Sequence, residues 1–168
     1  MSRYGNLLTD LREQLQGIEP STDESCTCVE YFPCAVIPKD GRRDNRVYLA
    51  SAEPWFRKWG VWPEDDPGKS LIRIEDIVSI AESPSRLPAK FANELYRAGE
   101  SGMGYTVFTV EFSGLIKSHR TYLTGNAVDF IEYPWRKGPK DVIGVLPHVG
   151  RDARPRNGPR YSWCLFSD

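Results

Sequence analysis

Histidines come first among the residues that could do chemistry, because imidazole exchanges protons near neutral pH. The chain contains two, His119 and His148. His119 precedes a Gly125–Asn126 pair, and a two-residue turn there would place His119 opposite Glu132 on the next run of strand-forming residues. A carboxylate beside an imidazole could form an acid–base pair, or a cross-strand ion pair at the rim of the core. We favour the ion pair, because the third group that catalysis usually requires is missing.

The same turn predicts a polar cluster on the other face of the hairpin. It would place Tyr122 opposite Asp129, with Arg120 on the diagonal. This cluster could bind an anionic or peptide ligand. We favour a surface network whose polar groups satisfy one another.

A segment rich in tryptophan is a second candidate surface. Residues 54–63 hold three of the five tryptophans beside two cations, and its candidate binding residues are Trp55, Arg57 and Trp59. Aromatic faces interleaved with cations can stack on bases or form a protein-binding hot spot. The alternative, which we favour, is a lid whose tryptophans close one end of the core.

Arginines gather near the end of the chain. Residues 148–160 are rich in Arg, Pro and Gly, and the candidate binding residues there are Arg151, Arg154 and Arg156. Guanidinium groups suit phosphates and carboxylates. The composition predicts a mobile loop, which could also be merely solvated.

The cysteines predict neither a metal site nor a cofactor. Cys26, Cys28 and Cys34 are separated by one residue and then five, whereas zinc sites usually have two residues between paired cysteines. Cys34 and Cys164 are flanked by apolar residues, which favours buried, reduced thiols.

The helices and strands that carry these residues predict an α+β fold. We expect a single domain over residues 1–168, in which an antiparallel, curved sheet with a β-meander at about 104–133 is covered by two helices. A partly open barrel is the alternative. The periodicity predicts main helices at 5–16 and 87–98, a short helix at 53–59, and strands at 28–37, 46–50, 142–146 and 161–166. Residues 70–80 fit a helix, but their β-branched side chains favour two strands.

Composition narrows the classes of function. With 22 basic and 23 acidic residues the net charge is −1, so no global field attracts nucleic acid, and nucleic-acid binding is disfavoured. No apolar run is long enough to cross a membrane, and the first residues do not resemble a secretory signal, so we expect a cytoplasmic protein.

These observations predict a small soluble interaction domain. It would bind a protein partner through its Trp-rich and Arg-rich segments, and the scarcity of histidine argues against an enzyme. Two alternatives stay open: a small enzyme that holds an anionic substrate and uses His119 with Glu132, or His148; and a nucleic-acid-binding domain with an aromatic stacking platform.

Overall fold

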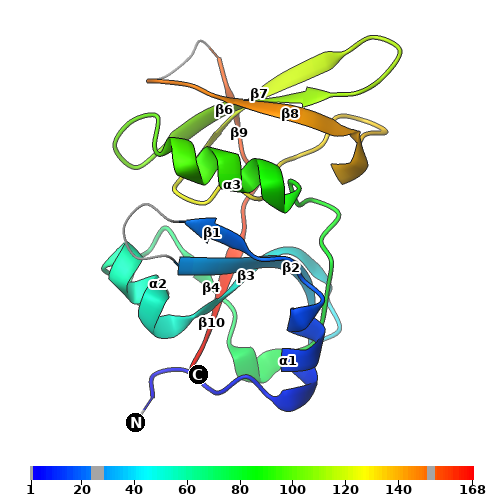
Figure 1. The fold of residues 1–168 in the computed structure, drawn as a ribbon. Helices are drawn as coiled ribbons and strands as arrows, with labels where there is room; N and C mark the ends of the chain where they lie inside the picture. The colour runs from blue at the N-terminus through cyan, green and yellow to red at the C-terminus, as the bar shows by residue number, and fades with distance from the viewer. Residues whose placement is uncertain (1, 24–28, 151–153) are drawn as a thin grey trace. The chain divides into compact units, whose positions relative to one another are not determined.

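The computed structural model describes residues 2–23, 29–150 and 154–168, and the chain forms two compact units. Unit 1 comprises Met1–Pro84 with Arg160–Asp168, and unit 2 comprises Ser85–Pro159. Each unit combines an open sheet with helix, so the predicted α+β class is confirmed (Figure 1). The expectation that residues 1–168 act as a single domain stays a prediction.

The sheet of unit 1 is mixed. In the described residues its order is β1-β2-β3-β10-β4, and β5 pairs with β2 (Figure 1). The bounds are Ser21–Asp23 for β1, Val29–Pro38 for β2, Asp44–Ser51 for β3, Ser70–Leu71 for β4, Ile77–Ala81 for β5 and Ser162–Phe166 for β10. Strands β2 and β3 lie where strands were predicted, and they pair as an antiparallel hairpin. The expectation of purely antiparallel pairing is wrong, because β10 runs parallel to both β3 and β4. The long stretch of chain between β3 and β10 allows this crossover.

Two helices cover opposite faces of this sheet. Helix α1 spans Thr9–Gln16 and helix α2 spans Ala52–Trp59; short 3₁₀ turns follow at Pro63–Asp65 (η1) and Ile74–Asp76 (η2). Leu11 and Leu15 of α1 pack into an apolar cluster with β-strand residues that include Leu49 and Cys164. Tyr48 and Trp163 alternate with those residues, so they face α2.

Aromatic side chains fill the space between the sheet and α2. The ring centroid of Trp163 lies 4.8 Å from that of Tyr48, 5.3 Å from that of Trp55 and 5.2 Å from that of Trp59. The Trp59 indole also donates a hydrogen bond of 3.2 Å to the Tyr31 hydroxyl. The Trp-rich segment therefore builds the core of unit 1.

Unit 2 is a four-stranded sheet in the order β8-β6-β7-β9, together with one helix in the described residues. The elements are α3 (Ala89–Ala98), β6 (Thr106–Phe112), β7 (Ser118–Thr124), η3 (Pro139–Asp141), β8 (Val142–Pro147) and β9 (Arg156–Asn157). Helix α3 buries Phe91, Leu95 and Tyr96. None of the described helices is long and apolar enough to cross a bilayer.

The predicted meander forms only in part. Strands β6 and β7 pair as an antiparallel hairpin, but the third predicted run, residues 127–133, is not a strand. The backbone of this run forms hydrogen bonds with the segment before α3 instead. The Leu87 amide donates to the Asp129 carbonyl at 2.6 Å, and the Ile131 amide donates to the Ser85 carbonyl at 3.1 Å. The positions beside β7 belong to β6 and to the parallel strand β9.

The buried position of Trp55 yields a stability prediction. Trp55→Ala should lower the free energy of unfolding by about 3–5 kcal/mol, because it empties a fully enclosed site. Trp55→Phe should cost less, since the buried indole N–H has no hydrogen-bond partner in the described residues. Urea denaturation measures both. The control Trp135→Ala, at a highly exposed position, should stay within about 0.5 kcal/mol of the original protein, and equal losses at both positions would contradict this packing.

Candidate functional site

The predicted pairing of His119 with Glu132 lacks its structural basis. His119 on β7 lies opposite Glu111 of β6 and is exposed, and Glu132 lies outside the strands. The turn at Gly125–Asn126 does not join two paired strands, so the predicted register across it is wrong. The argument for an acid–base pair at these two residues fails with that register.

His148 belongs to a hydrogen-bond network across the sheet. Its Nε2 atom lies 2.8 Å from the Thr109 hydroxyl, which in turn lies 2.7 Å from the Thr121 hydroxyl. The His148 amide also donates to the Val107 carbonyl at 2.9 Å. A hydroxyl within reach of an imidazole is the geometry of a nucleophile and its base. Here the hydroxyl belongs to the central strand β6 and is shared with β7, so the network ties neighbouring strands together.

The predicted polar cluster forms in part. Burial raises the pKa of Tyr122, and the neighbouring cations Arg120 and Arg156 partly oppose this rise. The Tyr122 hydroxyl donates to the Glu132 carbonyl at 2.7 Å. The structure therefore brings Arg120 and Tyr122 together as predicted and adds Arg156, which lies beside Tyr122 in the parallel β7–β9 pair.

Asp129 is not part of this cluster. It is fully buried, and its carboxylate accepts a hydrogen bond of 2.5 Å from the Tyr96 hydroxyl of α3. The same hydroxyl accepts a bond from the Val128 amide at 3.2 Å. The expectation that Asp129 faces Tyr122 is wrong, because residues 127–133 leave the sheet and pack beside α3. Asp129 anchors that segment.

The remaining predicted binding residues differ in accessibility. Trp55 is fully buried and Trp59 is half-buried, which agrees with the lid that the sequence favoured, whereas Arg57 is exposed beside Glu53 at 3.6 Å. Arg154 and Arg156 are exposed in unit 2. Arg151 lies outside the described residues.

An exposed apolar surface that the sequence analysis missed lies on two loops of unit 2. Leu115 is fully exposed in the β6–β7 loop, and Ile116 and Trp135 are 87% and 83% exposed. The Lys137 ammonium donates to the Ser113 carbonyl and so holds the loop of Trp135 beside the β6–β7 loop. We call Leu115, Ile116, Trp135 and Arg136 the loop patch. The available signal was the adjacent pair Leu115–Ile116 inside a turn that otherwise reads as polar.

Arg136 gives the loop patch a defined geometry. Its guanidinium carbon lies 4.2 Å from the centroid of the Trp135 ring, within the range of a cation–π contact. Its backbone φ is 61°, a left-handed conformation that is uncommon outside glycine. Such strain persists only where the surroundings impose it, and it is common at binding sites.

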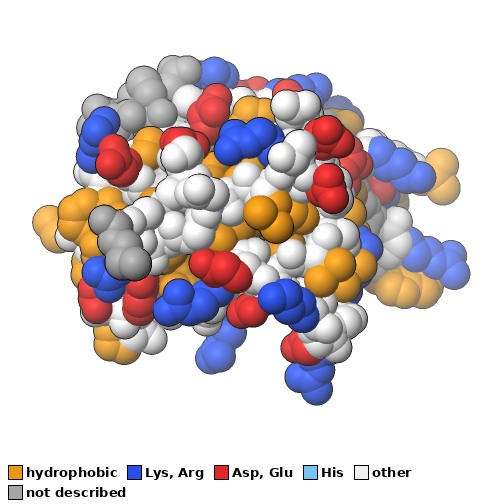
Figure 2. Space-filling model, turned by 90° about the horizontal axis from the view of Figure 1, so that it is seen from below, with side chains coloured by type: hydrophobic (Ala, Val, Ile, Leu, Met, Phe, Trp, Pro, Cys, Tyr) orange, Lys and Arg blue, Asp and Glu red, His pale blue; other side chains and the backbone are white. Residues whose placement is uncertain are grey.

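Comparisons with protein-family models, with curated proteins and with solved structures gave no significant match. On the face shown in Figure 2, basic and acidic side chains are interspersed, which is unlike the continuous basic surface that nucleic acid needs.

The buried contact of Asp129 predicts a structural role. Tyr96→Phe should lower the free energy of unfolding by about 1.5–3 kcal/mol, because it removes a hydrogen bond to a buried carboxylate. Chemical denaturation followed by circular dichroism measures this change. Glu94→Gln, at an exposed position of α3, should leave stability unaltered. If Tyr96→Phe is as stable as the Glu94 variant, Asp129 does not anchor its segment.

Proposed function

We propose that this protein is a small interaction domain that binds a protein partner through the loop patch of unit 2. One observation carries the proposal: Leu115, Ile116 and Trp135 expose large apolar side chains on two loops that a hydrogen bond holds side by side. Exposed apolar side chains that gather in one place mark interaction sites more often than single ones do.

The composition of the loop patch supports a protein partner. Tryptophan and arginine are the residue types most enriched in binding hot spots, and here Arg136 stacks on Trp135. This contact holds the indole in a defined position, which lowers the entropy lost on binding. Trp135 is then the anchor, and Leu115 and Ile116 enlarge the apolar contact around it.

Charges around the patch indicate the partner's chemistry. Lys117 and Arg136 are exposed beside the apolar side chains, and Lys140 lies exposed further along the second loop. A partner with an apolar groove and acidic groups at its rim would complement this arrangement. Arg154 and Arg156, exposed in the same unit, are candidates for additional contacts.

Other features support binding rather than catalysis. The His148–Thr109 contact belongs to a network inside the sheet. Cys164 is a buried thiol whose pKa is raised by burial, which suppresses the reactive thiolate. Cys34 is a second buried thiol, which donates a hydrogen bond of 3.6 Å to the Val47 carbonyl, and two buried thiols support the proposal of a cytoplasmic protein.

Partner capture from the native host tests the proposal. With the unsubstituted protein as bait, one specific protein should be captured. Trp135→Ala should weaken that complex by about 2 kcal/mol or more, as loss of a hot-spot anchor does. Leu115→Ser should weaken it too. Binding of the purified partner is measured by calorimetry.

Val78→Ser is the matched control, because Val78 is an apolar side chain of unit 1 that is 57% exposed. It should bind as the original protein does. Equal binding by all variants would refute the loop patch as the site. Binding to vesicles of anionic lipid with no protein captured would replace the proposal with a membrane-surface role.

A further inference from the structure

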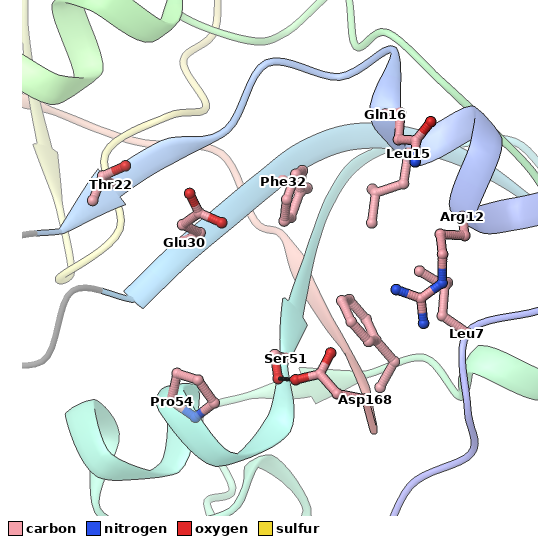
Figure 3. Close-up of a pocket in the computed structure, with 11 residues that line it drawn as sticks. Leu7, Arg12, Leu15, Gln16, Thr22, Glu30, Phe32, Ser51, Pro54 and Asp168 are labelled. Atoms are coloured by element: carbon pink, nitrogen blue, oxygen red, sulfur yellow. Dashed lines mark hydrogen bonds between the residues drawn. The ribbon is translucent and has the colours of Figure 1, made fainter.

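Unit 1 contains a cavity that the proposed function does not use. Its volume is about 520 Å³, within the range of sites that bind small molecules. Its walls come from α1, β1, β2, the start of α2 and the end of the chain segment after β10 (Figure 3). It lies on the α1 face of the sheet, away from the tryptophan core.

The floor of the cavity is apolar. Leu15 of α1, Phe32 of β2 and Phe166 of β10 line it. Phe32 is only partly buried, although it packs against the apolar cluster beneath. An apolar body bound here would cover the part of the Phe32 ring that is now in contact with water, since Leu15 and Phe166 are already buried.

Opposite charges stand at the two ends. Figure 3 shows Glu30 on one side of the cavity and Arg12 on the other, with Phe32 and Leu15 between them. Neither charged side chain forms an ion pair or side-chain hydrogen bond with another described residue. The third charged group, Asp168, already accepts a hydrogen bond of 2.6 Å from the Ser51 hydroxyl. Glu30 and Arg12 therefore keep their capacity to bind charged groups.

We infer that this cavity binds a zwitterionic ligand with an apolar body, of the size of a short apolar peptide with free ends. Its ammonium group pairs with Glu30 and its carboxylate pairs with Arg12, which can bind both carboxylate oxygens at once. The apolar body lies over Phe32, Leu15 and Phe166. This inference is independent of the loop patch, which belongs to the other unit.

The orientation follows from the placement of the charges. A ligand with only one charge would form one of the two ion pairs and forgo the other, so it would bind less tightly than a zwitterion. A ligand with two charges but no apolar body would leave the floor in water. Both features together define the ligand class.

Titration of the full chain with the tripeptide Leu-Phe-Leu tests the inference, with amide shifts in NMR as the readout. We expect shifts in α1 and β2. The same tripeptide with an acetylated amino end and an amidated carboxyl end should bind at least about tenfold more weakly, because it lacks both charges.

Variants assign the two ends separately. Glu30→Gln should weaken binding of the free tripeptide but leave the affinity for the tripeptide with an acetylated amino end unchanged. Arg12→Gln should also weaken binding of the free tripeptide, but should leave the affinity for the tripeptide with an amidated carboxyl end unchanged. Glu13→Gln and Arg42→Gln, at exposed positions outside the cavity, are the matched controls and should bind normally. Equal affinity for free and blocked tripeptide, absence of binding, or unchanged affinity in both cavity variants would overturn the inference. Loss of binding at the loop patch leaves this outcome unaffected.

Discussion

The packing of Trp163 against the aromatic residues of β2, β3 and α2 is the interaction on which unit 1 depends. Trp163 sits on β10, which enters between β3 and β4 after the chain has built unit 2. Its ring lies against Tyr31 of β2, Tyr48 of β3 and both Trp55 and Trp59 of α2, so four elements of unit 1 meet at one side chain. Burial of these large aromatic side chains contributes more to the stability of unit 1 than its surface contacts do.

This packing also determines which aromatic side chains stay at the surface. Trp55 and part of Trp59 are packed inside unit 1, whereas Phe56 and Trp62 of the same segment stay partly exposed. In unit 2, Trp135 is 83% exposed and stacks with Arg136 in solvent. The bond from Lys137 to Ser113 holds the loop of Trp135 beside the β6–β7 loop, which carries Leu115 and Ile116. The exposed aromatic surface is thus set by which aromatic residues the core accepts.

Local patterns predicted much of the fold. Apolar periodicity identified the helices α1 and α3 and the strands β2 and β3. The prediction of a third strand in the meander was wrong because it rested on a local turn signal. The outcome was decided by backbone bonds from Leu87 and Ile131 to distant parts of unit 2. The parallel entry of β10 is likewise a long-range event that no local pattern encodes.

The candidate sites divide in the same way. Arg120 and Tyr122 lie two apart on one strand, so their proximity could be predicted from alternation. The partner of Asp129 is Tyr96, which depends on how α3 packs, and that packing could not be read from spacing. The loop patch could not be predicted without knowing which loops lie side by side, because Lys137 and Ser113 are far apart in the chain. Predicting the cavity of unit 1 would likewise have required the relative placement of Arg12 and Glu30, which lie on two different elements.

Site-specific photo-crosslinking in the native host tests the central claim most directly, because it reports what touches the loop patch itself. A photoreactive residue is placed at position 115 or 135, and at position 78 as the control. The account predicts that positions 115 and 135 both crosslink to the same protein and that position 78 does not. Adducts with that protein from position 78 alone, or no protein adduct from either loop, would contradict it.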